Sequence, residues 1–194
     1  MINIQEDYSS KKDEELVELT LQNPETYYFL MKRYEDRIAR YIFRISGVSK
    51  EDGEDLVQDV FLSAYKNIND FDRRLKFSSW LYRIAHNKTI SFWRKMKIRP
   101  PMIGSEDDEL LKTIASSEDI AKDLDHKYTA AEIKKILDRL DEKYREVLVL
   151  KFIESKDYQE ISDILEKPLG TVGTLISRAK EKFRELSLER GVKL

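Results

Sequence analysis

The sequence has no cysteine, only two histidines, and few of the residues that interrupt helices. Without Cys, its 194 residues can form no disulfide, no Cys-ligated zinc site and no thiol nucleophile. Two His leave little room for a His-rich metal centre, so we expect neither a metal nor a cofactor. Six Gly and four Pro in the whole chain predict long helices with few turns.

The sequence also lacks a run of about 18 consecutive apolar residues, so we expect no membrane-spanning helix. Residues 1–10 are polar and acidic, unlike a secretory signal, and a cytoplasmic protein is therefore expected. No paired acid and base, no Gly-rich phosphate loop and no cluster of metal ligands stands out in the sequence. We predict a protein that is not an enzyme and has no catalytic residue.

Charge is abundant but segregated, although the formal net charge is only −2. Residues 73–103 carry nine basic side chains and no acidic one, and residues 167–194 carry seven basic against three acidic. Residues 1–26, 50–72 and 104–126 are acidic. This pattern indicates at least one polyanionic partner for the basic segments. The acidic segments would form surfaces that avoid this partner or face a basic one.

Apolar residues recur at helical spacing through most of the chain, and no alternating strand pattern is present. Residues 102–126 lack a clean apolar stripe and are acidic, which is typical of an extended tether. We therefore predict an all-α protein with two small helical domains, residues 1–99 and 127–194. An acidic flexible linker, residues 100–126, would join them.

The C-terminal domain contains a pattern typical of a helix-turn-helix. A helix over residues 157–165 is followed by a turn at 166–168 and by a second amphipathic helix. The first half of such a second helix enters the major groove of DNA, and Arg178 is the best candidate for contacting a guanine edge. The polar residues expected to face the duplex are Lys167, Thr171, Thr174, Ser177, Arg178, Lys180 and Lys182.

An ordinary helical hairpin with a solvated basic face would produce a similar pattern. Glu181 and Glu185 also face outward and would repel phosphate. Recognition is therefore expected to concentrate before Glu181.

The basic segment 73–103 also contains aromatic residues. On a helical projection one apolar face is predicted to pack in the core, and that face includes Trp80. Tyr82 and Trp93 fall on the opposite face beside cations. Aromatic rings among cations suit single-stranded nucleic acid, because bases stack on the rings while cations hold the phosphates. The core face is predicted to comprise Phe77, Trp80, Leu81, Ile84, Ala85 and Phe92.

A third feature is an acidic helix around residues 51–59. Acids early in a helix favour its N-terminus electrostatically, but this does not account for Asp59 and Gln58, two turns in. An acidic strip on a protein that binds DNA elsewhere suggests a basic protein partner.

These three features occur in the order found in bacterial RNA polymerase sigma factors, and the chain closely resembles the extracytoplasmic-function (ECF) group. The segment from Glu54 to Tyr65 is similar to the family's polymerase-binding helix, and Phe77–Asn87 resembles its promoter-melting segment. Tyr158–Ile161 together with Pro168–Val172 resembles its helix-turn-helix. The resemblance covers about residues 12–187.

The resemblance implies a role for each surface. Asp55, Gln58 and Asp59 would dock on the clamp helices of the largest subunit of core RNA polymerase. The loop 71–77 would hold a flipped base of the opened minus-ten strand, and the C-terminal helix would bind the minus-thirty-five duplex. The residues implied in single-strand binding are Phe71, Arg73, Arg74, Lys76, Phe77, Tyr82, Arg83, Asn87, Trp93 and Arg94.

Two positions depart from the family pattern. Gly173 stands where the family often has Lys or Arg, and Ser162 replaces a usual Ala. The first puts the promoter sequence in doubt, but not the class of protein. The resemblance also implies control by an anti-sigma factor. The alternatives are a stand-alone helix-turn-helix regulator, which would leave the basic aromatic helix and the acidic helix without a task, and a helical adaptor that does not bind DNA.

Overall fold

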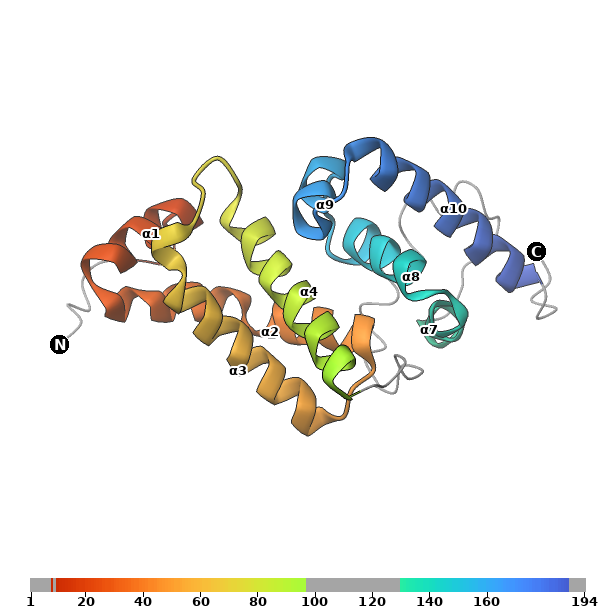
Figure 1. Ribbon diagram of the computed structural model, residues 1–194, viewed down its shortest axis with the longest axis horizontal. Helices are drawn as coiled ribbons and strands as arrows, with labels where there is room; N and C mark the ends of the chain where they lie inside the picture. The colour runs from red at the N-terminus through yellow and green to blue at the C-terminus, as the bar shows by residue number, and fades with distance from the viewer. Residues whose placement is uncertain (1–7, 9, 97–129, 189–194) are drawn as a thin grey trace. The chain divides into compact units, whose positions relative to one another are not determined.

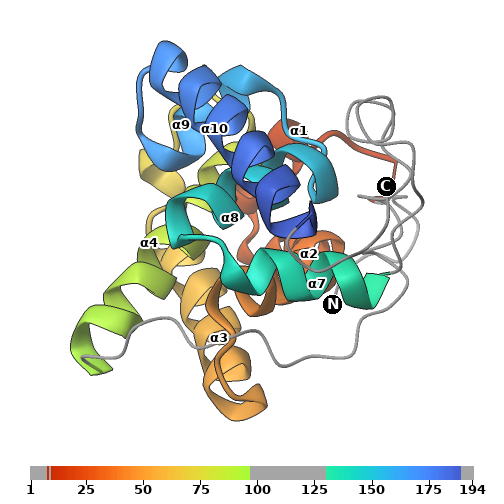
Figure 2. The ribbon, with the colours of Figure 1, turned by 90° about the vertical axis from the view of Figure 1, so that its right-hand side faces the viewer.

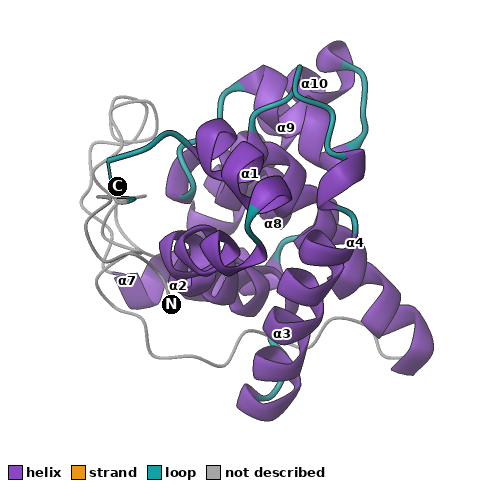
Figure 3. Ribbon diagram, turned by 90° about the vertical axis from the view of Figure 1, so that its left-hand side faces the viewer, coloured by secondary structure: helices purple, strands orange, loops and turns teal. Residues whose placement is uncertain are grey.

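The computed structural model describes residues 8, 10–96 and 130–188 (Figure 1). These residues are helical or lie in short connections, and no strand occurs among them (Figure 3). They group into two compact units, one built by α1 to α4 and the other by α7 to α10, with Phe43–Val48 grouping with the second. The all-α prediction is confirmed. The predicted linker, residues 100–126, lies outside the described residues.

The first unit runs through α1 (Asp13–Gln22), a 3-10 turn η1 (Pro24–Thr26), α2 (Tyr27–Ser46) and α3 (Lys50–Lys66). A second 3-10 turn η2 (Ile68–Asp70) and a loop then lead to α4 (Phe77–Met96). Helix α4 lies beside α3 (Figure 1). The start of α3 is fixed by Ser49, whose hydroxyl accepts a hydrogen bond from the Asp52 N–H at 3.2 Å.

Aromatic side chains join the helices in the core of this unit. Tyr41 and Tyr82 are fully buried with ring centroids 5.0 Å apart, so α2 packs on α4 through them. Phe77 is also fully buried and meets the Tyr34 ring edge-on at 5.8 Å. The hydroxyl of Tyr27 donates to the carbonyl oxygen of Phe61 at 2.8 Å, which ties α2 to α3.

The second unit comprises α7 (Ala130–Arg139), α8 (Glu142–Leu148), a π-helical turn η3 (Val149–Ile153), α9 (Tyr158–Leu165) and α10 (Leu169–Leu188). Arg145 of α8 is buried and donates to the backbone carbonyls of Leu137 and Leu140 at 3.1 and 3.2 Å. Burial lowers the pKa of this guanidinium. The arginine thereby satisfies carbonyls at the end of α7 and fixes α7 against α8.

Helices α9 and α10 form the predicted helix-turn-helix (Figure 2). Asp157 caps α9 reciprocally with Glu160, each side chain accepting from the other's backbone N–H at 2.7 and 3.0 Å. Glu166 ends the helix in a left-handed conformation, with φ of 51°. Across the turn, the Ser162 hydroxyl donates to the Lys167 carbonyl at 2.6 Å. Ser162 thus stabilises the turn, a role that its sequence position did not indicate.

Within the described residues, no helix is long and apolar enough to cross a membrane.

Candidate functional site

The acidic stripe on α3 consists of Asp55, Gln58 and Asp59, and all three side chains are exposed. Their helix buries its other face through Leu56 and Val60, so packing of α3 turns the polar residues outward. This is the placement that the helical pattern predicted.

Two large apolar side chains extend the acidic stripe. Leu62 follows Gln58 and Asp59 at i+4 and i+3 and is 51% exposed. Tyr65 is 40% exposed and contacts the Tyr27 ring in a tilted arrangement, with the ring centroids 5.1 Å apart. Leu62 was not predicted at this surface, because an apolar residue in an amphipathic helix is normally assigned to the core. Their exposure makes this end of α3 suited to a partner with an apolar as well as a basic surface.

The loop between η2 and α4 presents the predicted cations. Arg73, Arg74 and Lys76 are all exposed. Arg74 donates to both carboxylate oxygens of Asp72 at 2.7–3.1 Å, which lowers the pKa of Asp72 to about 2. This fork-shaped pair joins two side chains of the loop at its surface.

The acids of α1 hold this loop from the N-terminal side. Glu18 pairs with Arg73 at 2.9 Å, and the carboxylate of Glu14 accepts from the Phe77 N–H at 3.4 Å, at the start of α4. Asp13 accepts from Arg33 at 2.6 Å and from the Tyr34 hydroxyl. The described acids Asp13, Glu14 and Glu18 of the N-terminal segment, which had no assignment from sequence, therefore bind cations and donors of their own domain.

The aromatic members of the predicted single-strand site are buried, which contradicts the predicted exposure of Tyr82 and Trp93 but agrees with the predicted core position of Phe77. Phe71, Phe77, Tyr82 and Trp93 are 7%, 0%, 0% and 5% exposed. The reason is that α4 is covered on more than one side. The face that was predicted to be exposed to solvent is therefore buried. Trp80 shows the reverse error: predicted to lie in the core, it is only half-buried.

Trp80 lies on an aromatic cluster beneath the basic loop. Its ring centroid is 5.3 Å from that of Phe71 and 5.7 Å from that of Phe77. Buried rings on one side and solvent on the other leave part of the indole available for stacking. Among the predicted polar contacts on α4, Asn87 and Arg94 are exposed and Arg83 is half-buried.

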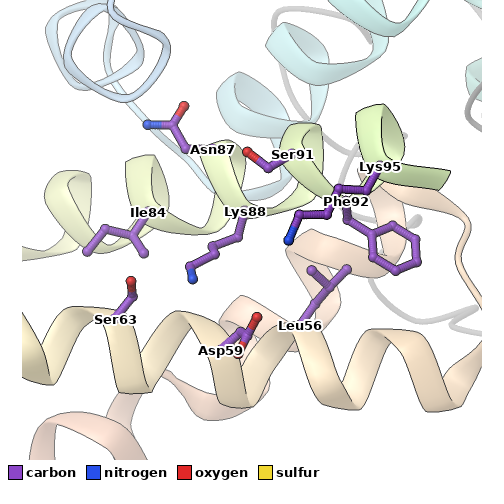
Figure 4. A pocket seen from close by; sticks show the side chains of 9 residues that line it. All are labelled: Leu56, Asp59, Ser63, Ile84, Asn87, Lys88, Ser91, Phe92 and Lys95. Carbon is purple, nitrogen blue, oxygen red and sulfur yellow. The ribbon is translucent and has the colours of Figure 1, made fainter. Parts of the chain in front are cut away.

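A groove with a volume of about 500 Å³ separates α3 from α4 (Figure 4). Lys88 and Lys95 of α4 and Asp59 of α3 point into it, whereas the side chain of Asn87, which also borders it, points away from α3 (Figure 4). Ile84 and Phe92, both predicted to be core residues, are half-buried and line the same groove. Because the apolar stripe of α4 borders this groove, its side chains are not all fully buried.

The helix-turn-helix turns its predicted recognition residues outward. Thr171, Thr174, Ser177 and Arg178 are exposed on α10, while the other face is buried through residues such as Val172 and Ile176. The Thr174 hydroxyl donates to the Gly170 carbonyl at 2.9 Å, so its oxygen lone pairs and methyl group are what it presents outward.

The basic residues around the recognition face are exposed to different degrees. Lys167 and Lys180 are half-buried and Lys182 is exposed. Lys182 pairs with Glu185 at 2.5 Å, and Glu181 is exposed as predicted. The acidic side chains thus lie toward the C-terminal half of α10, away from the first recognition residues.

No group of three or more His, Cys, Asp or Glu residues that could hold a metal ion occurs in the part of the chain that the structure describes. The features that stand out there are exposed charged surfaces.

Comparison with known families matches both units. Residues 30–98 match the family model "Sigma-70 region 2", and residues 130–183 match "Sigma-70, region 4". The acidic stripe, the basic loop and the groove lie within the first match, and α9 with most of α10 lies within the second.

Individual proteins give the same result. The chain is 39% identical over 160 residues to the ECF RNA polymerase sigma factor SigW of Bacillus subtilis, covering 78% of this chain and 83% of SigW. It is 30% identical over 180 residues to the ECF RNA polymerase sigma-E factor of Haemophilus influenzae, covering 87% and 92% of the two chains.

Two solved structures share the fold. CnrH, in complex with the cytosolic domain of CnrY, superposes with a TM-score of 0.67 at 26% identity, covering 92% of this chain and 98% of that one. The sigma factor RpoE of Bartonella quintana, crystallised with the anti-sigma factor NepR, gives a TM-score of 0.59 at 22% identity, covering 80% and 92%.

Proposed function

The chain belongs to the ECF group of RNA polymerase sigma factors, and from this premise we propose which of its surfaces bind the polymerase and the promoter. It is a transcription initiation factor and not an enzyme. The observation that carries the assignment of surfaces is that the acidic stripe on α3, the basic loop before α4 and the recognition face of α10 are all exposed. We place its action in the cytoplasm, where bacterial transcription occurs.

We propose that the acidic stripe binds the clamp helices of the largest polymerase subunit. The exposed carboxylates of Asp55 and Asp59 suit a basic surface, and Gln58 between them can both donate and accept hydrogen bonds. Leu62 and Tyr65 add apolar area at one end, which favours a partner helix that combines basic and apolar residues.

We propose that the loop and the exposed side of α4 hold the opened minus-ten strand. Arg73, Arg74 and Lys76 supply cations for its phosphates. Trp80, and not Tyr82 or Trp93, offers a ring on which a base can stack. The buried rings of Phe71, Phe77, Tyr82 and Trp93 support this surface from the core. The remaining members of the proposed surface are Arg83, Asn87 and Arg94.

Neutralising Glu18 should raise affinity for the single strand. Glu18→Gln removes the carboxylate that pairs with Arg73 at 2.9 Å, so the guanidinium no longer has to exchange that partner for phosphate. Both side chains are more than half exposed, so we expect a gain of only about 2–3-fold at low salt that disappears at high salt. Fluorescence anisotropy with a labelled minus-ten strand and protein bound to core polymerase measures the affinity.

Glu15→Gln is the matched control for this change, because Glu15 lies on the same helix but its carboxylate accepts from the Lys12 N–H. An equal gain from both variants would show a general charge effect and contradict the specific role of Glu18.

We propose that the first half of α10 binds the minus-thirty-five duplex in the major groove. Thr171, Thr174, Ser177 and Arg178 face the bases, and Lys167, Lys180 and Lys182 lie where phosphates can be contacted. Because Arg178 is the long cationic side chain among the outward residues, it is the one expected to discriminate a guanine.

Arg178→Ala should relax base preference at one promoter position. A bidentate contact from Arg to guanine contributes about 1–3 kcal/mol of discrimination, so we expect a loss of about 5- to 150-fold for the preferred sequence and little loss for others. Promoter libraries bound by the holoenzyme and then sequenced measure this. Lys182→Ala, a phosphate contact, should weaken all sequences alike; sequence-independent loss for Arg178→Ala would contradict its assignment.

The proposed function is tested by co-migration with core RNA polymerase on gel filtration followed by promoter binding. We expect a stable complex that binds promoter fragments selectively. We further propose that an anti-sigma factor restrains the protein by covering the same exposed surfaces. A protein that binds duplex DNA alone as a dimer and does not join core polymerase would be the stand-alone regulator instead.

A further inference from the structure

A hollow of about 510 Å³ opens beside the recognition helix, between α9 and α10. It lies on the flank of α10, next to the residues proposed to face the bases. Tyr158 of α9 forms one wall and is 41% exposed. The residues from α10 that line it include Gly173, Ser177, Lys180, Glu181 and Arg184.

Nothing in the described chain requires Gly173 to be glycine. An L side chain would be strained at positive φ, but the φ of Gly173 is not in that range. A Cβ added there would meet only Tyr158 Cε1, at 3.8 Å, which is an ordinary van der Waals contact. Glycine inside a helix is nonetheless less stable than alanine. The protein therefore keeps a destabilising residue at a place where a larger one would fit.

The charge around the hollow is mainly positive. Lys180 and Arg184 line it, and Lys151 lies over the Tyr158 ring with its Nζ 5.1 Å from the centroid. Glu181 is the one acid among the residues that line this hollow. Gly173, Ser177, Lys180 and Arg184 follow one another at four, three and four residues, so they form one strip along the helix. This strip borders the recognition face through Ser177.

We propose that the hollow is a seat for one backbone phosphate of the minus-thirty-five duplex, and that Gly173 sets how closely the strand approaches α10. The proposal rests on the proposed function, since α10 must lie in the major groove for a strand to pass its flank. A glycine allows close approach of a ligand to the helix backbone, and the surrounding cations suit a phosphate better than a base edge. Such a contact fixes the position of the helix and carries no sequence preference itself.

Gly173→Ala should change stability and binding in opposite directions. In the full chain we expect the melting temperature to rise by about 2–4 °C, because alanine favours the helix. Affinity for a duplex selected by the wild-type holoenzyme should fall by about 5- to 10-fold, equally for preferred and altered sequences. Calorimetry and holoenzyme binding assays measure the two effects.

The phosphate itself can be located by replacing phosphates of that duplex, one at a time, with uncharged methylphosphonate. We expect one position where the replacement weakens wild-type binding but has little effect on Gly173→Ala. Gly170→Ala serves as the matched control: it is the same change on the same helix, where nothing lies within 4 Å of the added Cβ, and it should keep the wild-type sensitivity.

Unchanged duplex affinity of Gly173→Ala would overturn the phosphate seat, and so would a loss of affinity that depends on base sequence. Equal sensitivity of Gly173→Ala and Gly170→Ala to methylphosphonate at every position would overturn it as well. A wild-type holoenzyme that binds no duplex selectively would instead overturn the proposed function, so the two failures are distinguishable.

Discussion

Asp55→Arg combined with Asp59→Arg is expected to abolish binding to core RNA polymerase while the protein stays helical. Both carboxylates are exposed on α3, so their replacement removes no buried contact and leaves the fold intact. Against a basic partner, each reversal turns attraction into repulsion, and like charges across an interface cost several kcal/mol. We expect affinity for core polymerase to fall by more than about 100-fold. Competition binding against a labelled sigma factor measures the loss, and circular dichroism measures helicity.

A matched control separates the stripe from overall charge. Glu25→Arg with Asp36→Arg makes the same change in net charge at two exposed positions on other elements of this unit, η1 and α2. This control should keep most of the affinity for core polymerase. Retained binding by the α3 variant, or equal loss in the control, would move the interface away from the acidic stripe.

Phe77→Ala should cause the largest loss of stability among the changes considered. Phe77 is fully buried and its ring meets those of Tyr34, Phe71 and Trp80 within 5.8 Å. Removing such a ring loses its burial and leaves a cavity, which typically costs about 3–5 kcal/mol. We expect a melting temperature lower by at least about 10 °C, measured by calorimetry.

Trp80→Ala is the informative contrast on the same cluster. Because Trp80 is half-exposed, its truncation should destabilise the protein less than Phe77→Ala does. It should nevertheless impair promoter opening strongly, with binding to core polymerase unchanged, since base stacking contributes about 1–3 kcal/mol per ring. Permanganate footprinting measures opening. A Trp80 variant that opens promoters normally would place the stacking surface elsewhere.

For Trp93 and its neighbours on α4, the sequence did not predict which side chains are buried. Helical periodicity predicts a helix from Phe77 to about Lys97, close to the observed α4 at Phe77–Met96, but it yields only one apolar stripe. In the fold, Tyr82 packs against Tyr41 of α2, while Ile84 borders a groove against α3. Which faces of a helix meet neighbours depends on how the other helices are placed. Aromatic residues beside cations therefore could not be sorted into core and surface.

The exposure of the acidic stripe could be predicted from the sequence, whereas the contacts of the N-terminal acids could not. The exposed placement of Asp55, Gln58 and Asp59 follows from amphipathicity alone, because α3 packs on a single broad face. The acids of α1 were not assignable, since Glu18 meets Arg73, 55 residues away in the chain. Similarly, Ser162 became explicable only once the turn brought the Lys167 carbonyl to its hydroxyl.

Run-off transcription with core RNA polymerase, a library of promoters and this protein added or omitted tests the central claim most directly. The account predicts that addition of the protein produces transcripts from a subset of promoters that share minus-ten and minus-thirty-five elements, and that the Asp55→Arg and Asp59→Arg double variant produces none. Core enzyme that gains no promoter-specific initiation when the wild-type protein is added would contradict it.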